Sequence, residues 1–122
     1  MKTIQQQTGK SGEDLAAGFL KKNGYKIITR NYRYRKSELD IVCRKKNTVI
    51  VVEVKSIKTL DYGYPEERIA SKKQRQIIKA TYAFLNSYKK YGGKELRFDV
   101  ITVNMGSEPP EIKHYQGAFW QR

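Results

Sequence analysis

Two neighbouring apolar segments of the chain each contain a carboxylate. Asp40 lies within the segment Glu38–Arg44, and Glu53 lies within the segment Val49–Lys55. An ionised carboxylate in apolar surroundings costs several kcal/mol unless it is paired, coordinated or protonated. These two acids are therefore the first candidates for chemistry in this sequence.

The spacing of the two segments predicts a β-hairpin that brings the acids together. If residues 45–48 form a symmetric four-residue loop, Asp40 lies opposite Glu53 and Glu38 lies opposite Lys55. Directly opposed side chains have Cβ atoms about 4.5–5.5 Å apart, and like charges this close repel unless a cation lies between them. The pattern predicts a site for Mg²⁺ or Mn²⁺, which prefer oxygen ligands, with the Lys55 ammonium at its edge.

A second interpretation of the same residues is structural. Glu38, Glu53 and Lys55 could form ordinary ion pairs on a solvated sheet face. The valines and isoleucines around them favour the metal site. Register decides the matter, because a slip of one residue would put Asp40 and Glu53 on opposite faces of the sheet.

The charge of the chain indicates which partners to expect. Its 122 residues include 25 Lys and Arg against 12 Asp and Glu, a formal net charge of +13. A strongly basic protein attracts polyanions by releasing their counterions. Nucleic acid is the first candidate, an anionic membrane surface the second, and the ribosome or acidic proteins follow.

Cysteine content and hydropathy predict a soluble cytoplasmic protein. Cys43 is the only cysteine, so neither an intramolecular disulfide nor a cysteine-based zinc site can form. Cys43 itself is expected in the core. The polar N-terminus lacks the apolar run of a signal peptide, and no apolar run approaches the length of a membrane-spanning helix.

The periodicity of apolar residues predicts one mixed α/β domain over residues 11–122, preceded by a flexible segment at 1–10. The expected elements follow the order α-β-β-β-α-β, with one further edge strand at the C-terminal end. They are a helix from Ser11 to Gly24, extended chain from Tyr25 to Arg35, the carboxylate hairpin, a helix from about Glu66 to Tyr91, a strand from Leu96 to Val103 and an edge strand from Ile112 to Trp120. Since the second helix is a crossover, the strands before and after it should be parallel.

Two basic stretches are candidates for binding nucleic acid. The first interleaves Arg30, Arg33, Arg35 and Lys36 with tyrosines, a composition that can hold phosphates and stack on unpaired bases. A solvated edge strand explains this stretch equally well. The second contains Lys72 and Lys73 on the long helix, where a run of charge most often marks the solvated face.

Several motifs occur in the order found in a known family. They are Gly12-Glu13, Gly24-Tyr25, Arg30-Asn31, Glu38-x-Asp40, Glu53-Val54-Lys55, Gly63-x-Pro65 and Asp99-Val100. This order resembles the YraN-like family, which is similar to the archaeal Holliday-junction resolvases of the PD-(D/E)XK nuclease superfamily. The resemblance implies a restriction-endonuclease-like fold, Mg²⁺ or Mn²⁺ as cofactor, and a homodimer acting on DNA.

The resemblance also implies residue roles. Asp40 and Glu53 would be metal ligands, Glu13 an auxiliary ligand, and Lys55 the catalytic lysine. Glu13 has a simpler role available, since an acid in the first turn of a helix stabilises the helix dipole. The superfamily often has a proline before its first acid, whereas Ser37-Glu38-Leu39 precedes Asp40 here.

Two functions follow from these observations. The first is a metal-dependent, structure-specific DNA endonuclease that hydrolyses phosphodiester bonds, with RNA as an open alternative to DNA. The second is a non-catalytic nucleic-acid-binding protein with the same fold.

Two further residues are expected to have structural roles. Asp99 could cap a backbone group or pair with Arg97, and His114, the single histidine, is expected to be structural rather than catalytic.

Overall fold

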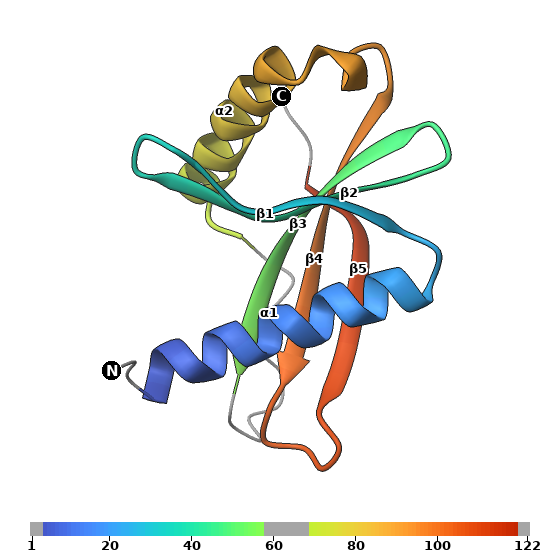
Figure 1. The fold of residues 1–122 in the computed structure, drawn as a ribbon. Coiled ribbons are helices and arrows are strands. Elements are labelled where there is room, and N and C mark those ends of the chain that lie inside the picture. The colour runs from blue at the N-terminus through green and yellow to red at the C-terminus, as the bar shows by residue number, and fades with distance from the viewer. Residues whose placement is uncertain (1–3, 58–68, 120–122) are drawn as a thin grey trace.

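The computed structural model describes residues 4–57 and 69–119, with the side chains of residues 11 onward (Figure 1). Two α-helices, a short 3₁₀ helix and five strands follow one another along the chain. They are α1 (Ile4–Lys22), β1 (Lys26–Tyr34), β2 (Ser37–Lys45), β3 (Thr48–Ile57), α2 (Ser71–Ser87), η1 (Lys89–Tyr91), β4 (Glu95–Asn104) and β5 (Glu111–Phe119). The expected element order is confirmed, including the additional strand at the C-terminal end.

The strands form one mixed sheet in the order β1-β2-β3-β4-β5. Neighbouring strands are antiparallel except β3 and β4, which are parallel and lie on either side of α2 in sequence. A parallel pair needs a crossover connection, and α2 supplies it. The predicted mixed α/β architecture is therefore confirmed.

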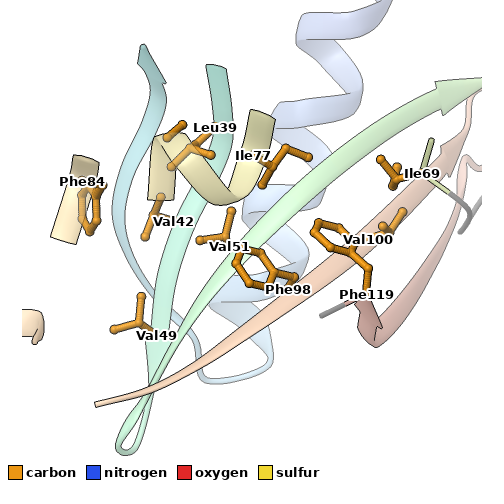
Figure 2. Close-up of a cluster of buried hydrophobic side chains, with 11 residues drawn as sticks. Leu39, Val42, Val49, Val51, Ile69, Ile77, Phe84, Phe98, Val100 and Phe119 are labelled. Carbon is orange, nitrogen blue, oxygen red and sulfur yellow. The ribbon is translucent and has the colours of Figure 1, made fainter. Parts of the chain in front are cut away.

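The two helices cover opposite faces of the sheet, so each face has its own core (Figure 1). α1 packs mainly on β3, where Ala16 and Leu20 lie with Ile41 and Ile50 in one buried cluster. α2 packs on β1 and β2, and Figure 2 shows its Ile77 and Phe84 beside the side chains of the sheet. Strands covered on both faces are apolar on both faces, which explains the continuous Val and Ile runs of β3 and β4.

The first helix begins at Ile4, so the expectation of a helix start at Ser11 after a flexible segment is wrong for residues 4–10. Three consecutive glutamines, which favour helix, extend it toward the N-terminus. Its end agrees with the sequence. Gly24 has φ of 88°, and the Tyr25 and Gly24 N–H groups donate to the carbonyls of Leu20 and Lys21 (2.9 and 3.1 Å), which closes the helix with a Schellman motif.

The second helix begins at Ser71 rather than near Glu66. Ala70 before it is extended (ψ 145°), and the Gln74 side-chain amide donates to the Ile69 carbonyl at 2.7 Å. Glu66 and the Gly63-x-Pro65 motif lie outside the described residues.

The buried face of α2 differs from the expected one at two tyrosines. Ile77, Ala80, Thr81 and Phe84 are buried, at the three- and four-residue spacing of one helix face. The apolar periodicity of this segment predicts that Tyr82 or Ala83, together with Tyr88, lies on this face, but Tyr82 and Tyr88 are 47% and 48% exposed. Thr81 occupies the core position instead because its hydroxyl donates to the Ile77 carbonyl at 2.8 Å, which satisfies its polar group.

Gly12 permits the close approach of α1 to β3. A Cβ built on Gly12 would lie 1.8 Å from Ser56 Oγ and 3.0 Å from Ser56 Cβ, whereas one on Gly18 of the same helix meets nothing within 4 Å. We expect Gly12→Ala to lower the free energy of unfolding by about 1–3 kcal/mol through overpacking. Gly18→Ala is the matched control and should stabilise the helix by about 0.5–1 kcal/mol. Urea denaturation measures both, and equal effects of the two substitutions would contradict this packing.

Candidate functional site

The two carboxylates lie where strands β2 and β3 stop pairing. The ladder runs from Lys45 opposite Thr48 to Ile41 opposite Val52 and ends there, although both strands continue. Asp40 and Glu53 are the next residues on the two strands. The predicted register is confirmed, while the loop is shorter than expected, with Lys45 and Thr48 already paired.

The strand β2 twists at this point, which opens a fork in the sheet. Leu39 packs in the core beneath α2, whereas Ile41 packs in the core beneath α1. Residues two apart on a regular strand face the same side, so the chain turns over at Asp40. The fork leaves backbone groups of β3 without a ladder partner, and Asp40 Oδ2 accepts a hydrogen bond from the Val54 N–H at 2.8 Å.

The carboxyl groups of Asp40 and Glu53 contact each other. The Glu53 side chain is 11% exposed. Burial, then the hydrogen bond with Asp40 and the charge of Asp40, together raise the pKa of Glu53 to about 9, although the charges of Lys73 and Lys55 lower it. Without a cation, the pair therefore retains a proton at neutral pH. Mg²⁺ and Mn²⁺ prefer oxygen ligands, and the carboxylates of Asp40 and Glu53 can supply two of them. A bound cation would displace the shared proton, so the residues fit part of a metal site.

Two lysines lie beside this pair. Lys73 Nζ of α2 is 3.9 Å from Glu53 Oε2, and Lys55 lies close enough to lower the Glu53 pKa. The sequence placed Lys73 in a general basic face of the helix, and only the packing of α2 on the sheet brings it to the fork. Lys55 is on the same strand as Glu53, but the ladder ends before the predicted pairing of Lys55 with Glu38, which pairs with Arg33 of β1 instead.

Glu13 is engaged elsewhere. Its Oε1 accepts from Arg30 Nε and Nη2 (3.2 and 3.1 Å), and its Oε2 accepts from Asn31 Nδ2 at 3.0 Å. The same amide donates to Glu38 Oε1 at 3.2 Å. Over residues 4–57 and 69–119, no three His, Cys, Asp or Glu side chains are grouped so as to hold a metal ion. The structure thus brings Asp40 and Glu53 together and does not add Glu13 to them.

Asn31 is a site residue that sequence reasoning did not single out. It has φ of 55°, a left-handed conformation that asparagine tolerates better than most residues. Its side chain connects an acid of α1 with an acid of β2. Asn31 belongs to the Arg30-Asn31 motif, but the sequence does not indicate that its side chain bridges two acids.

The predicted nucleic-acid-binding residues fall into two groups. Arg30 pairs with Glu13 and Asp14, and Arg33 lies 3.5 Å from Glu38, so these two cations balance acids of the protein. The remaining predicted cations are exposed at the turn between β1 and β2 and in the first turn of α2, where Lys73 also lies beside Glu53: Arg35, Lys36, Lys72 and Lys73.

A second buried acid serves the fold. Asp99 is fully buried and accepts hydrogen bonds from Arg97 (2.8 Å to each oxygen), His114 Nε2 (2.7 Å) and the Gly117 N–H (3.0 Å). These bonds outweigh the effect of burial and lower the pKa of Asp99. Pairing with Arg97 was one of the two expected interpretations, and it is confirmed. Cys43 is buried as expected, and burial raises its pKa to about 12.

Comparison with known sequences decides the family. A family model described as "Uncharacterised protein family UPF0102" matches residues 12–103. The chain belongs to this family. It is 43% identical over 111 residues to a UPF0102 protein of Syntrophotalea carbinolica, an alignment that covers 91% of this chain and 89% of that protein. It is also 41% identical over 121 residues to a UPF0102 protein of Clostridium beijerinckii, covering 98% of each.

The YraN-like resemblance of the motifs is therefore confirmed at the level of the family. Among solved structures, the UPF0102 chain is similar to SfsA of Pyrococcus furiosus in complex with Ca²⁺, with a TM-score of 0.36 and 20% identity. That alignment covers 92% of this chain and 63% of the other, so this chain spans under two thirds of the SfsA chain. In the described part of the chain, no helix has the length and apolar character needed to cross a membrane.

Proposed function

We propose that this protein is a metal-dependent nuclease that hydrolyses phosphodiester bonds of nucleic acid at the fork between β2 and β3. The observation that carries the proposal is the contact between Asp40 and Glu53, two carboxyl groups held in a protonated pair beside Lys55 and Lys73. Burying two acids together destabilises a protein unless they share a proton or bind a cation. A functional site explains why they lie at a break in the sheet.

Each residue has a role in this proposal. Asp40 and Glu53 hold Mg²⁺ or Mn²⁺, and the bound ion supplies Lewis-acid stabilisation of the charge that develops on the scissile phosphate. Lys55 orients the attacking water or neutralises the phosphate oxygens. The Asp40 side chain is fixed by the Val54 N–H, so one of its oxygens is oriented before any ligand arrives. Lys73 provides a second positive charge for the nucleic-acid backbone.

The substrate proposed is DNA with a branched or single-stranded region. A net charge of +13 supports a polyanionic substrate, and the resemblance to junction resolvases supports branched DNA and a homodimer, because a branched substrate needs paired cuts. RNA is the alternative polymer.

Cleavage of a panel of labelled DNAs tests the function. The panel contains a four-way junction, a flap, a single strand and a plain duplex, each with Mg²⁺, Mn²⁺ or EDTA. We expect metal-dependent cleavage, and a fall of about 10²–10³-fold in rate for Lys55→Ala, the range for removing one group that stabilises transition-state charge. Lys113→Ala, an exposed lysine of β5, is the matched control and should cleave normally. Cleavage that persists in Lys55→Ala would contradict the assigned role.

The second candidate is a non-catalytic nucleic-acid-binding protein. One observation favours it: in the part of the chain that the structure describes, Glu13 does not complete a three-acid group with Asp40 and Glu53. This candidate predicts DNA binding with steep salt dependence, no need for a divalent metal, and no cleavage of any substrate in the panel.

A further inference from the structure

A groove lies between the β1–β2 turn and one side of α2. Its volume is about 1000 Å³, and its lining includes Arg35 and Lys36 of the turn and Lys79 and Tyr82 of α2. Neither Asp40 nor Glu53 lines it. The groove is therefore distinct from the pair of carboxyl groups, and its chemistry can be considered separately.

The charge of the groove is of one sign. Arg35, Lys36 and Lys79 are exposed cations, and among the described lining residues there is no aspartate or glutamate. By contrast, Arg30 is neutralised by two acids of the protein, Glu13 and Asp14. A groove lined by cations with no acid of its own suits an anionic polymer, since each phosphate bound releases counterions.

The groove also offers surfaces for unpaired bases. The Tyr82 side chain is 47% exposed although it is aromatic, and the Tyr34 ring lies 5.2 Å from the guanidinium carbon of Arg35. Gln76 and Asn86 add amide groups that can hydrogen-bond to base edges. Aromatic rings stack on bases only where the bases are not held in a duplex, so this combination is typical of sites for single strands.

The helix α2 connects this groove with the candidate active site. The four groove residues of α2 that recur at three- and four-residue intervals follow one side of the helix: Gln76, Lys79, Ala83 and Asn86. Lys73, which is 3.9 Å from Glu53 Oε2, lies three residues before Gln76 and is its neighbour on the helix surface. The rise of a helix places Lys73 and Asn86 about 20 Å apart along the axis. A strand that enters at Glu53 can thus continue along the helix.

We propose that this groove binds a single-stranded segment of nucleic acid adjacent to the scissile bond, with Tyr82 stacking on a base and Lys79 binding a phosphate. The proposal rests on the proposed function in placing the groove beside a nuclease site. If the groove binds a single strand, the enzyme should prefer a substrate with an unpaired arm to an intact duplex.

Binding measured without cleavage tests the groove separately from catalysis. Binding is measured in EDTA with the full-length Asp40→Asn protein, which serves as the parent for the other substitutions. The probes are a fluorescent 15-nucleotide dT strand, an rU strand of equal length and a 15-base-pair duplex. We expect Tyr82→Ala to weaken single-strand binding about tenfold or more, Tyr82→Phe to restore it, and duplex binding to remain unchanged. We expect Lys79→Ala to reduce the slope of log affinity against log salt by about 0.7 on the single strand.

Tyr88→Ala, which removes a tyrosine of similar exposure outside the groove, and Lys21→Ala on α1 are the matched controls and should bind as the parent does. A Tyr82→Ala protein that binds the single strand as tightly as its parent, or that loses duplex binding equally, overturns the proposal. Loss on dT alone assigns the groove to DNA, and equal loss on rU extends it to RNA. Groove-dependent binding by a wild-type protein that cleaves nothing would overturn the nuclease and retain the groove.

Discussion

Asp40→Asn is expected to reduce cleavage by about 10³-fold or more while leaving DNA binding unchanged or slightly tighter. The substitution keeps an oxygen that can accept the Val54 N–H, so the local backbone should persist. It removes the charge that, together with Glu53, would hold the cation, and a catalytic metal supplies several kcal/mol of transition-state stabilisation. Binding is retained because the lost charge repels the DNA backbone.

The measurement for Asp40→Asn is paired. Single-turnover cleavage of the preferred substrate gives the rate, and anisotropy in EDTA gives the affinity of the same protein. Glu111→Gln removes one negative charge from an exposed position on β5 and should leave both values unchanged. If cleavage and binding fell together in Asp40→Asn, the role of Asp40 as a metal ligand would be wrong.

Asp99→Ala is expected to lower the free energy of unfolding by about 3–5 kcal/mol, the effect of removing one partner from a buried ion pair. Asp99 pairs with Arg97 of its own strand and connects β4 to β5 through His114 and the Gly117 N–H. Guanidinium denaturation measures the loss. Glu95→Gln changes an exposed acid of the same strand and should have little effect; a comparable loss in both variants would contradict the importance of this network.

The same acid predicts how stability depends on pH. The hydrogen bonds to Asp99 lower its pKa in the folded protein, so the stabilisation is present above the ordinary aspartate pKa of about 3.9 and is lost as the pH falls through the lower folded value. Wild-type stability should therefore decline in acid below about pH 4, and Asp99→Asn should show a smaller decline. Thermal unfolding across pH 2–7, an experimental range chosen around that aspartate value, compares the two proteins, and parallel curves would count against the assignment.

The hairpin register could be predicted from the sequence because only a short polar segment separates the two apolar segments. A short turn fixes the pairing of the strands on either side of it, and the observed ladder begins directly at that turn with Lys45 opposite Thr48. The order of elements followed for a similar reason, since α2 has the length of a crossover between parallel strands. These features depend on local pattern and on chain connectivity.

Other parts of the site depend on contacts that no local pattern contains. Lys73 reaches Glu53 only because α2 packs across β2, and Asp99 meets His114 only because β5 pairs with β4. The twist of β2 at Asp40 depends on which core receives Leu39 and which receives Ile41. α1 begins at Ile4 rather than at Ser11 because weak helix preferences of the preceding residues extend it toward the N-terminus.

A titration with Mn²⁺ tests the central claim, that Asp40 and Glu53 together bind a divalent cation. Electron paramagnetic resonance reports free Mn²⁺ directly, so the bound fraction can be followed in wild type and in Asp40→Asn at the same protein concentration. We expect wild type to bind Mn²⁺ with an affinity at least about tenfold higher than the variant, the smallest effect typical of disturbing a metal site. Equal binding curves for the two proteins would contradict a metal site at the fork.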